Sequence, residues 1–464
     1  AAQATASDYA VVVSKTTYND PAWREVADAL AARHDGQVVQ FADSVDDAKA
    51  ALAKSHPRFT CFVATPAEAG RDFVAQVHRL TRLYDADPWT DTQWGILTGY
   101  DAANALAIAK TERPLVVKKV ASGTEVALDA CTQGVWYDEL VKGKTVEKKP
   151  AGKPSLGAGP ADTTRALADT LSDYQADLFV TSGHATERDW QIGFTYRNGS
   201  FRSKAGKMYG VATSGERFEI ASDNPKVYLP IGNCLMGHID GPDAMALAWM
   251  NSCGVRQMAG YTVPTWYGYG GWGLLDYFVE QPGRYTLSEA FIANHQALLH
   301  RLYAAAPQTQ EADPPPGGSV RVSKVADAGQ ALHVTAQDVT GLLHDRDVVA
   351  FYGDPAWEAR MAPAPGALAY DQTLTELGGV YTLTITPRRG EDSFKPVNTN
   401  GAQRGWRPIV AFLPRRIGPA ELIAGGDLQP LIADDFVLVP NPRECDPSRA
   451  YVVKFRAPPA KSHE

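Results

Sequence analysis

Short apolar runs alternate with amphipathic stretches along much of the chain. Strand-like runs at 8–15, 36–42 and 58–65 alternate with stretches such as 21–34, where apolar positions recur at helical spacing. A strand covered by helices on both faces is apolar along its length, whereas a surface helix repeats its apolar positions every three to four residues. The pattern therefore predicts β–α repeats and a parallel sheet flanked by helices.

The same alternation returns in the middle of the chain. We expect helices at 161–175, 242–254 and 287–306, and strands at 176–185, 226–234 and 255–265. Between residues 111 and 160, β-rich segments and turns rich in Gly, Pro and Lys interrupt the pattern. This interruption is expected at the passage between two α/β subdomains.

The pattern of predicted elements changes again from about residue 367. Short strand-like runs separated by turn residues replace the helical stretches, and they lie at 380–386, 407–414, 435–439 and 450–457. Several short strands at regular spacing without long helices are typical of a β-sandwich.

Composition and charge give no support for a nucleic-acid-binding, membrane-spanning or disulfide-rich protein. The chain has 464 residues and a net charge of -8, so charge gives no reason to expect nucleic acid or an anionic membrane as a partner. No window approaches 18 consecutive apolar residues, so we expect no membrane span. Five cysteines are too few and too irregularly spaced for a disulfide framework.

Two predicted strands end in reactive residues. His184 follows "DLFVTSG", and Cys234 follows "KVYLPIGN" 50 residues later. Sites in open α/β sheets form at the carboxyl ends of strands, and a nearby imidazole can take the proton from a thiol to give the nucleophilic thiolate. Backbone N–H groups at such turns can bind the oxyanion that forms when sulfur attacks a carbonyl.

Other interpretations of the same residues stay open. A histidine at a strand end is often a hydrogen-bonded structural residue, and a cysteine among apolar neighbours is often packed in a core. A zinc site built from His184, Cys234, His238 and Asp240 is a third possibility, although no second cysteine stands at ligand spacing.

Four blocks, in this order, resemble those of the gingipain-like cysteine peptidases, in the class that includes caspases and clostripain. They are "SGHATERDW", "GNCLMGHID", "GYTVPTW" and "FYGDPAWEARM", and with preceding segments the resemblance covers roughly residues 56–361. A caspase histidine likewise lies about 50 residues before its cysteine. The resemblance implies a caspase-like α/β fold with mostly parallel sheets, flanking helices and two side-by-side subdomains, followed by an immunoglobulin-like β-sandwich.

This fold divides the chain into three expected domains. They are an N-terminal α/β subdomain at 1–110, a catalytic caspase-like subdomain at 111–362 and the immunoglobulin-like sandwich at 363–464.

The resemblance also implies roles for single residues. His184 matches the general base and Cys234 the nucleophile. The backbone N–H groups of Ala185 and Cys234 match the oxyanion hole, and Asp101 falls where the family has an acidic residue that orients the histidine. Trp266, with Thr265 before it, falls where a tryptophan lines the specificity pocket.

Some positions depart from the family's pattern. Ala185 stands where the family favours glycine, and Asn233 precedes the nucleophile where gingipains carry alanine. We find no acidic residue for the floor of the pocket, so we expect no strong preference for Arg or Lys before the scissile bond.

The implied function is hydrolysis of a protein or peptide substrate through a Cys-His dyad and an acyl-thioester intermediate, by an exported protein whose signal peptide is not in this chain. The alternative is a catalytically inactive, gingipain-like secreted or surface binding module. The chemistry requires no cofactor. Structural calcium accompanies the family, but no acidic loop here is specific enough to assign it.

Overall fold

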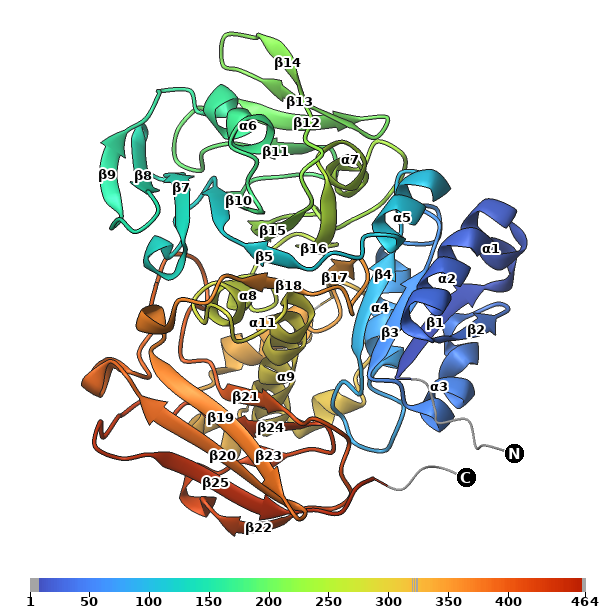
Figure 1. Ribbon diagram of the computed structural model, residues 1–464, viewed down its shortest axis with the longest axis vertical. Helices are drawn as coiled ribbons and strands as arrows, with labels where there is room; N and C mark the ends of the chain where they lie inside the picture. The colour runs from blue at the N-terminus through green and yellow to red at the C-terminus, as the bar shows by residue number, and fades with distance from the viewer. Residues whose placement is uncertain (1–7, 319, 321, 323, 461–464) are drawn as a thin grey trace.

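One large mixed sheet forms the centre of the molecule (Figure 1). The computed structural model describes residues 8–318, 320, 322 and 324–460, so the first seven residues lie outside it. Within this described part the sheet has twelve strands, in the spatial order β2 (Gln37–Phe41), β1 (Tyr9–Ser14), β3 (Phe59–Val63), β4 (Gln93–Leu97), β17 (Val349–Tyr352), β16 (Val255–Tyr261), β15 (Lys226–Asn233), β10 (Leu178–Gly183), β6 (Lys119–Ser122), β7 (Gln133–Tyr137), β8 (Lys144–Lys148) and β9 (Ser155–Ala158).

The sheet is mostly parallel, as the sequence predicts. The antiparallel pairs are β16 with β17, β7 with β8, and β8 with β9. Strand β17 pairs parallel with β4 on its other side, so it joins the two runs of β–α repeats into one continuous sheet.

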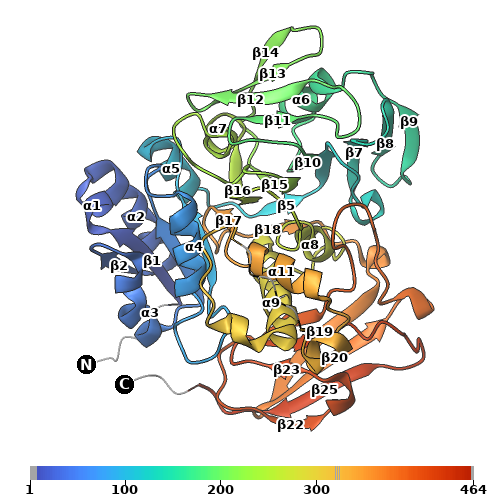
Figure 2. The ribbon, with the colours of Figure 1, turned by 180° about the vertical axis from the view of Figure 1, so that it is seen from behind.

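Helices cover both faces of the sheet (Figures 1 and 2). The second helix shows how the sequence sets its bounds: Asp20 accepts a hydrogen bond from the Ala22 N–H, Pro21 opens the helix, and Asp35 ends it with φ 49°. The helices are α1 (Lys15–Asn19), α2 (Pro21–His34), α3 (Lys49–Ser55), α4 (Arg71–Leu80), α5 (Ala102–Ala109), α6 (Thr164–Ser172), α7 (Met245–Ser252), α8 (Gly273–Phe278), α9 (Leu287–Ala305), α10 (Asp327–Ala331) and α11 (Ala336–Asp345).

A second, antiparallel sheet stands between β10 and β15 in the sequence. It consists of β11 (Asp189–Gln191), β12 (Ser200–Lys204), β13 (Lys207–Val211) and β14 (Arg217–Ile220). These strands use the residues that separate the two reactive strand ends, and they return the chain so that β15 lies beside β10.

The C-terminal region consists of two antiparallel sheets around a shared apolar core, seen in orange and red in Figure 2. Tyr381 and Phe455 come from one sheet and Val437 from the other. The first sheet contains β19 (Tyr370–Leu377), β20 (Val380–Pro387), β25 (Tyr451–Arg456) and β22 (Glu421–Ala424), and the second contains β21 (Ile409–Phe412), β24 (Phe436–Val439) and β23 (Leu431–Ile432).

A short parallel pair, β5 (Leu115–Val117) and β18 (Ala359–Met361), lies apart from the large sheet. In the described ranges, no helix combines the length and the apolar character that crossing a membrane requires.

Candidate active site

The ends of β10 and β15 meet at one edge of the central sheet. The two strands are parallel neighbours, and Gly183 at the end of β10 is the register partner of Asn233 at the end of β15. His184 and Cys234 are the next residues on each strand. The structure therefore brings the two sequence-predicted strand ends side by side (Figure 1).

The Cys234 thiol is half-buried and is held by the loop that follows β16. The backbone N–H of Thr265 donates a hydrogen bond to the Cys234 sulfur over 3.2 Å, and the Thr265 hydroxyl donates to the Asn233 carbonyl over 2.9 Å. These two hydrogen bonds fix the position of the sulfur at the end of β15.

The backbone after the thiol is strained. Leu235 has φ 59°, which is the left-handed region that residues other than glycine rarely adopt. Such conformations persist where the surrounding structure enforces them, and they cluster at active sites.

His184 is exposed, and its ring stacks on Phe194 with ring centroids 4.8 Å apart. No residue in the described part of the chain makes a hydrogen bond with the imidazole, so the interpretation as a hydrogen-bonded structural histidine lacks support. Gly183 before it has φ 95°, a conformation that glycine adopts without a steric penalty. The turn therefore places the imidazole outside the sheet, where it can contact a substrate.

A buried carboxylate that the sequence analysis missed lies beside this turn. The Thr124 hydroxyl donates to Oε1 of Glu139 over 2.7 Å, while Oε2 is buried and has no hydrogen-bond partner among the described residues. That oxygen lies 3.6 Å from the point that a Cβ on Gly183 would occupy. Burial raises the pKa of Glu139, although the nearby hydroxyls of Thr124 and Ser182 act to lower it.

The position of Glu139 carried a usable signal. It follows β7 by two residues, and β7 is parallel to β6, which is parallel to β10. An acidic residue just after a parallel strand emerges at the same edge of the sheet as His184. Sequence alone did not show that a single strand, β6, separates β7 from β10.

Asp101 is not brought to this site, which differs from the expectation. Its carboxylate accepts a hydrogen bond from the Asn104 N–H and caps α5. The preceding strand, β4, is separated from β10 by β17, β16 and β15. Neighbouring strands lie about 4.8 Å apart, so β4 and β10 are separated by roughly 19 Å.

Two backbone donors face no acceptor at the strand ends. Within the described ranges, neither the Ala185 N–H nor the Cys234 N–H donates a hydrogen bond, although the neighbouring Leu235 and Thr186 N–H groups do. Exposed or part-buried N–H groups beside a thiol and an imidazole can stabilise an oxyanion.

Trp266 lies on the same loop as Thr265, and 73% of it is exposed. Large aromatic side chains are mostly buried in monomeric proteins, so an exposed tryptophan one residue from a thiol contact is suited to a ligand-binding surface. The structure thus brings Thr265 to Cys234 and leaves the indole of Trp266 in solvent.

Two residues of the zinc alternative, His238 and Asp240, are engaged with other side chains. Nδ1 of His238 lies 3.1 Å from Glu187 and 3.3 Å from Arg71, and Asp240 accepts a hydrogen bond from Arg188 over 2.8 Å. In the part of the chain that the structure describes, possible metal ligands converge in two other groups instead, Asp85 with Asp87 and Asp91, and His56 with Asp85 and Asp434. Carboxylate oxygens of this kind suit a hard cation such as calcium.

No protein-family model matches the sequence, and no curated protein is similar to it at a significant level. Among solved structures, it is similar to the Arg-specific cysteine proteinase gingipain R, with 10% identity, 99% of each chain covered and a TM-score of 0.47. It is also similar to the complex of RgpB pro- and mature domains of Porphyromonas gingivalis, with 10% identity, 98% of this chain and 100% of that chain covered, and a TM-score of 0.44. The similarity to gingipains read from the sequence blocks is thus also found among solved structures.

Proposed function

We propose that this chain is a cysteine peptidase or amidohydrolase with a caspase-like, gingipain-related catalytic region and an immunoglobulin-like C-terminal sandwich. One observation carries the proposal: His184 and Cys234 directly follow register partners on neighbouring parallel strands. The N–H groups of Ala185 and Cys234 supply two donors there, and neither has an acceptor among the described residues.

The chemistry proceeds through a thioester. His184 takes the proton from the Cys234 thiol, and the sulfur attacks the carbonyl carbon of the scissile amide. The N–H groups of Ala185 and Cys234 hold the oxyanion, and protonated His184 gives its proton to the leaving amine. Water, deprotonated by His184, then attacks the thioester, and the thiol is restored as the acid product leaves.

We assign to Glu139 the orienting role that the resemblance had given to Asp101. Its Oε2 lies buried at the Gly183 turn and lacks a hydrogen-bond partner among the described residues, so it can accept a hydrogen bond from the imidazole. A carboxylate in that position fixes the histidine tautomer and stabilises the imidazolium that forms during the reaction.

The substrate is a peptide or protein outside the cell, because the resemblance implies an exported enzyme. Trp266 forms an exposed wall beside Thr265 on which the stem of a substrate side chain can lie. No required cofactor enters this mechanism.

A peptidyl acyloxymethyl ketone, which alkylates activated thiols, tests the proposal. We expect stoichiometric labelling of Cys234 at neutral pH, located by peptide mass spectrometry, and loss of labelling in Cys234→Ala and His184→Ala. Cys445 is the other half-buried thiol, so Cys445→Ala is the matched control and should label like wild type.

The alternative is the inactive binding module. It predicts slow, His184-independent modification of any accessible thiol and no turnover of a diverse peptide library. Equal labelling of wild type and His184→Ala would therefore overturn the peptidase proposal.

A further inference from the structure

A cavity of about 820 Å³ lies between the helical layer and the C-terminal sheets. Its walls come from the end of α9, from α10, α11 and their connection, and from the loops 403–408 and 440–446. None of the candidate active-site residues lines it. The volume is typical of sites that bind small molecules.

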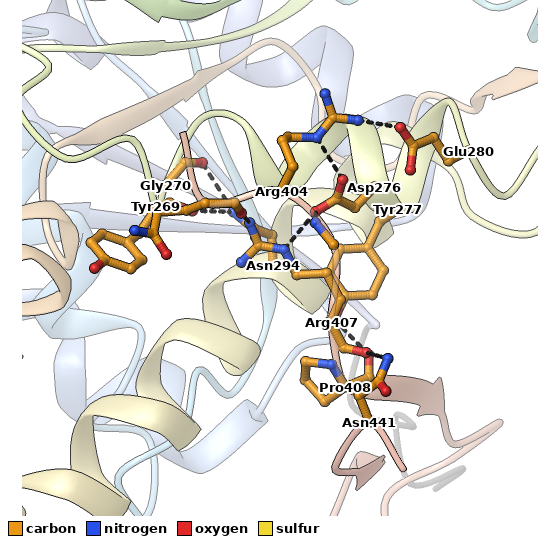
Figure 3. Close-up of polar contacts among 12 residues, drawn as sticks. Tyr269, Gly270, Asp276, Tyr277, Glu280, Asn294, Arg404, Arg407, Pro408 and Asn441 are labelled. Carbon is orange, nitrogen blue, oxygen red and sulfur yellow. Dashed lines mark hydrogen bonds and ion pairs between the residues drawn. The ribbon is translucent and has the colours of Figure 1, made fainter. Parts of the chain in front are cut away.

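Three of the five arginines that line this cavity have acidic partners. Arg404 and Arg407 both donate to Asp276 over 2.7 Å, and Arg404 also pairs with Glu280, as Figure 3 shows. Arg449 pairs with Asp427. The charges of these three guanidinium groups are therefore balanced within the protein.

The other two arginines differ. In the described part of the chain, the guanidinium groups of Arg301 and Arg443 make no hydrogen bond or ion pair, and each lies over an aromatic ring. Arg301 is 5.5 Å from the centre of Tyr269, and Arg443 is 4.9 Å from the centre of Trp406. Neither cation therefore forms an ion pair with a carboxylate of the described residues.

Burial lowers the pKa of Arg301, and the positive charges of Arg407 and Arg443 lower it further. Burial also lowers the pKa of Arg443. Asp338 is the acidic residue that acts in the opposite direction on Arg301. The remaining acidic lining residues, Asp427, Glu444 and Asp446, are exposed. Asp338 is therefore the acidic lining residue nearest in effect to Arg301, and hydrogen bonds from Tyr269 and Thr335 already engage its carboxylate.

Backbone strain is concentrated around the same cavity. Eleven residues other than glycine have positive φ in the described ranges, and five of them line it. They are His333 at 58°, Gln403 at 59°, Trp406 at 54°, Gln429 at 50° and Arg443 at 61°. Strained residues are costly and recur at ligand clamps, so their grouping favours a binding role over simple packing.

We infer that this cavity binds a small polyanion whose phosphate or carboxylate oxygens lie between Arg301 and Arg443. A guanidinium group presents parallel N–H donors that match the oxygens of a carboxylate or phosphate. The ligand supplies the negative charge that the two arginines lack, and the ring of Trp406 holds Arg443 in place.

Calorimetric titration of the full chain with pyrophosphate and, separately, with citrate tests this inference at fixed ionic strength. We expect saturable one-to-one binding of at least one probe, and the stronger probe distinguishes a phosphate ligand from a carboxylate ligand. Arg301→Gln and Arg443→Gln should each weaken binding at least tenfold. Arg388→Gln is the matched control, because Arg388 pairs with Asp371 at an exposed site outside the cavity and should leave binding unchanged.

Lysine variants keep the experiment decisive if a glutamine variant does not fold. Arg301→Lys and Arg443→Lys retain the charge but lose the paired donors, so binding should weaken less than with glutamine yet remain measurable. Absence of saturable binding by both probes, or wild-type affinity in folded Arg301 and Arg443 variants, would overturn the inference.

Discussion

Strands β4 and β10 belong to the same sheet, and the titratable residues that follow them differ in their hydrogen bonding. Strand β4 is followed by Thr-Gly-Tyr-Asp, and β10 ends in Thr-Ser-Gly before a histidine. Asp101 leads directly into α5 and caps it, whereas His184 enters a loop before β11 and its imidazole makes no hydrogen bond with a described residue. A side chain at the start of a helix satisfies backbone donors, while one that enters a loop stays available for chemistry.

The acidic residues of the two regions differ in the same way. Glu68, near the ends of β1 and β3, accepts hydrogen bonds from the Ser14 hydroxyl over 2.6 Å, the Thr17 hydroxyl over 2.6 Å and the Thr65 N–H over 2.9 Å. Glu139 keeps one buried oxygen without a partner among the described residues. Glu68 is thus engaged by three donors, whereas Glu139 retains an acceptor that a further donor can use.

The largest expected effect is a loss of kcat on substitution of His184 or Cys234 that substitution of Asp101 does not cause. Cys234→Ala and His184→Ala should each lower kcat for a cleaved peptide by about four to six orders of magnitude, because each removes a reacting group. Asp101→Asn should retain at least half of the wild-type kcat. Steady-state kinetics on a peptide chosen from a library measures all three.

Circular dichroism of the same variants is the control for folding. If Asp101→Asn lost activity as completely as His184→Ala while staying folded, the contrast between the two strand ends would fail.

The next largest effect is the different response of kcat and stability to substitution of Glu139 and of Glu68. Glu139→Gln should lower kcat by about 10²- to 10⁴-fold, because the histidine loses the charge that orients it. Glu68→Gln should leave kcat unchanged but lower the free energy of unfolding by about 1–3 kcal/mol, because it disturbs a satisfied network. Steady-state kinetics gives kcat and urea unfolding gives the free energy of unfolding for both variants.

The pH dependence sharpens this prediction. The pKa of Glu139 is raised by burial, so its stabilising contribution is present below the usual pKa of a glutamate and is lost as the pH rises. Glu139→Gln should therefore be at least as stable as wild type at pH 8. A variant that lost stability and activity in parallel would indicate a purely structural role.

A smaller effect concerns the wall beside Cys234. Trp266→Ala should raise KM about tenfold with little change in kcat, because the indole contacts the substrate side chain and not the reacting atoms. Matched peptides with Arg, Gln or Met before the scissile bond should be affected alike. A wild-type preference for Arg over Gln above about a hundredfold, near 2.7 kcal/mol, would reveal an acidic pocket floor that the sequence did not show.

Local sequence signals predicted many of the elements but not all of them, and not all of their neighbours. The bounds of α2 follow from Asp20 and Pro21, which act within one turn of the helix. The proximity of Glu139 to His184 depends instead on the order β10-β6-β7 in the sheet, which no local pattern contains. Strand β17 was missed as the link between the two regions because its four residues pair with strands distant in the sequence.

The smallest expected effect is a loss of stability on removal of the helix cap that Asp101 provides. Asp101→Ala removes the acceptor for the Asn104 N–H at the start of α5, and loss of such a cap costs about 1 kcal/mol. Asp101→Ser should restore most of that stability, because a serine hydroxyl can accept the same hydrogen bond. Both variants should cleave peptides at the wild-type rate, since the carboxylate lies three intervening strands away from β10. Urea unfolding and peptide kinetics on the pair decide the matter: unchanged stability in Asp101→Ala together with impaired turnover in both variants would return Asp101 to the catalytic site.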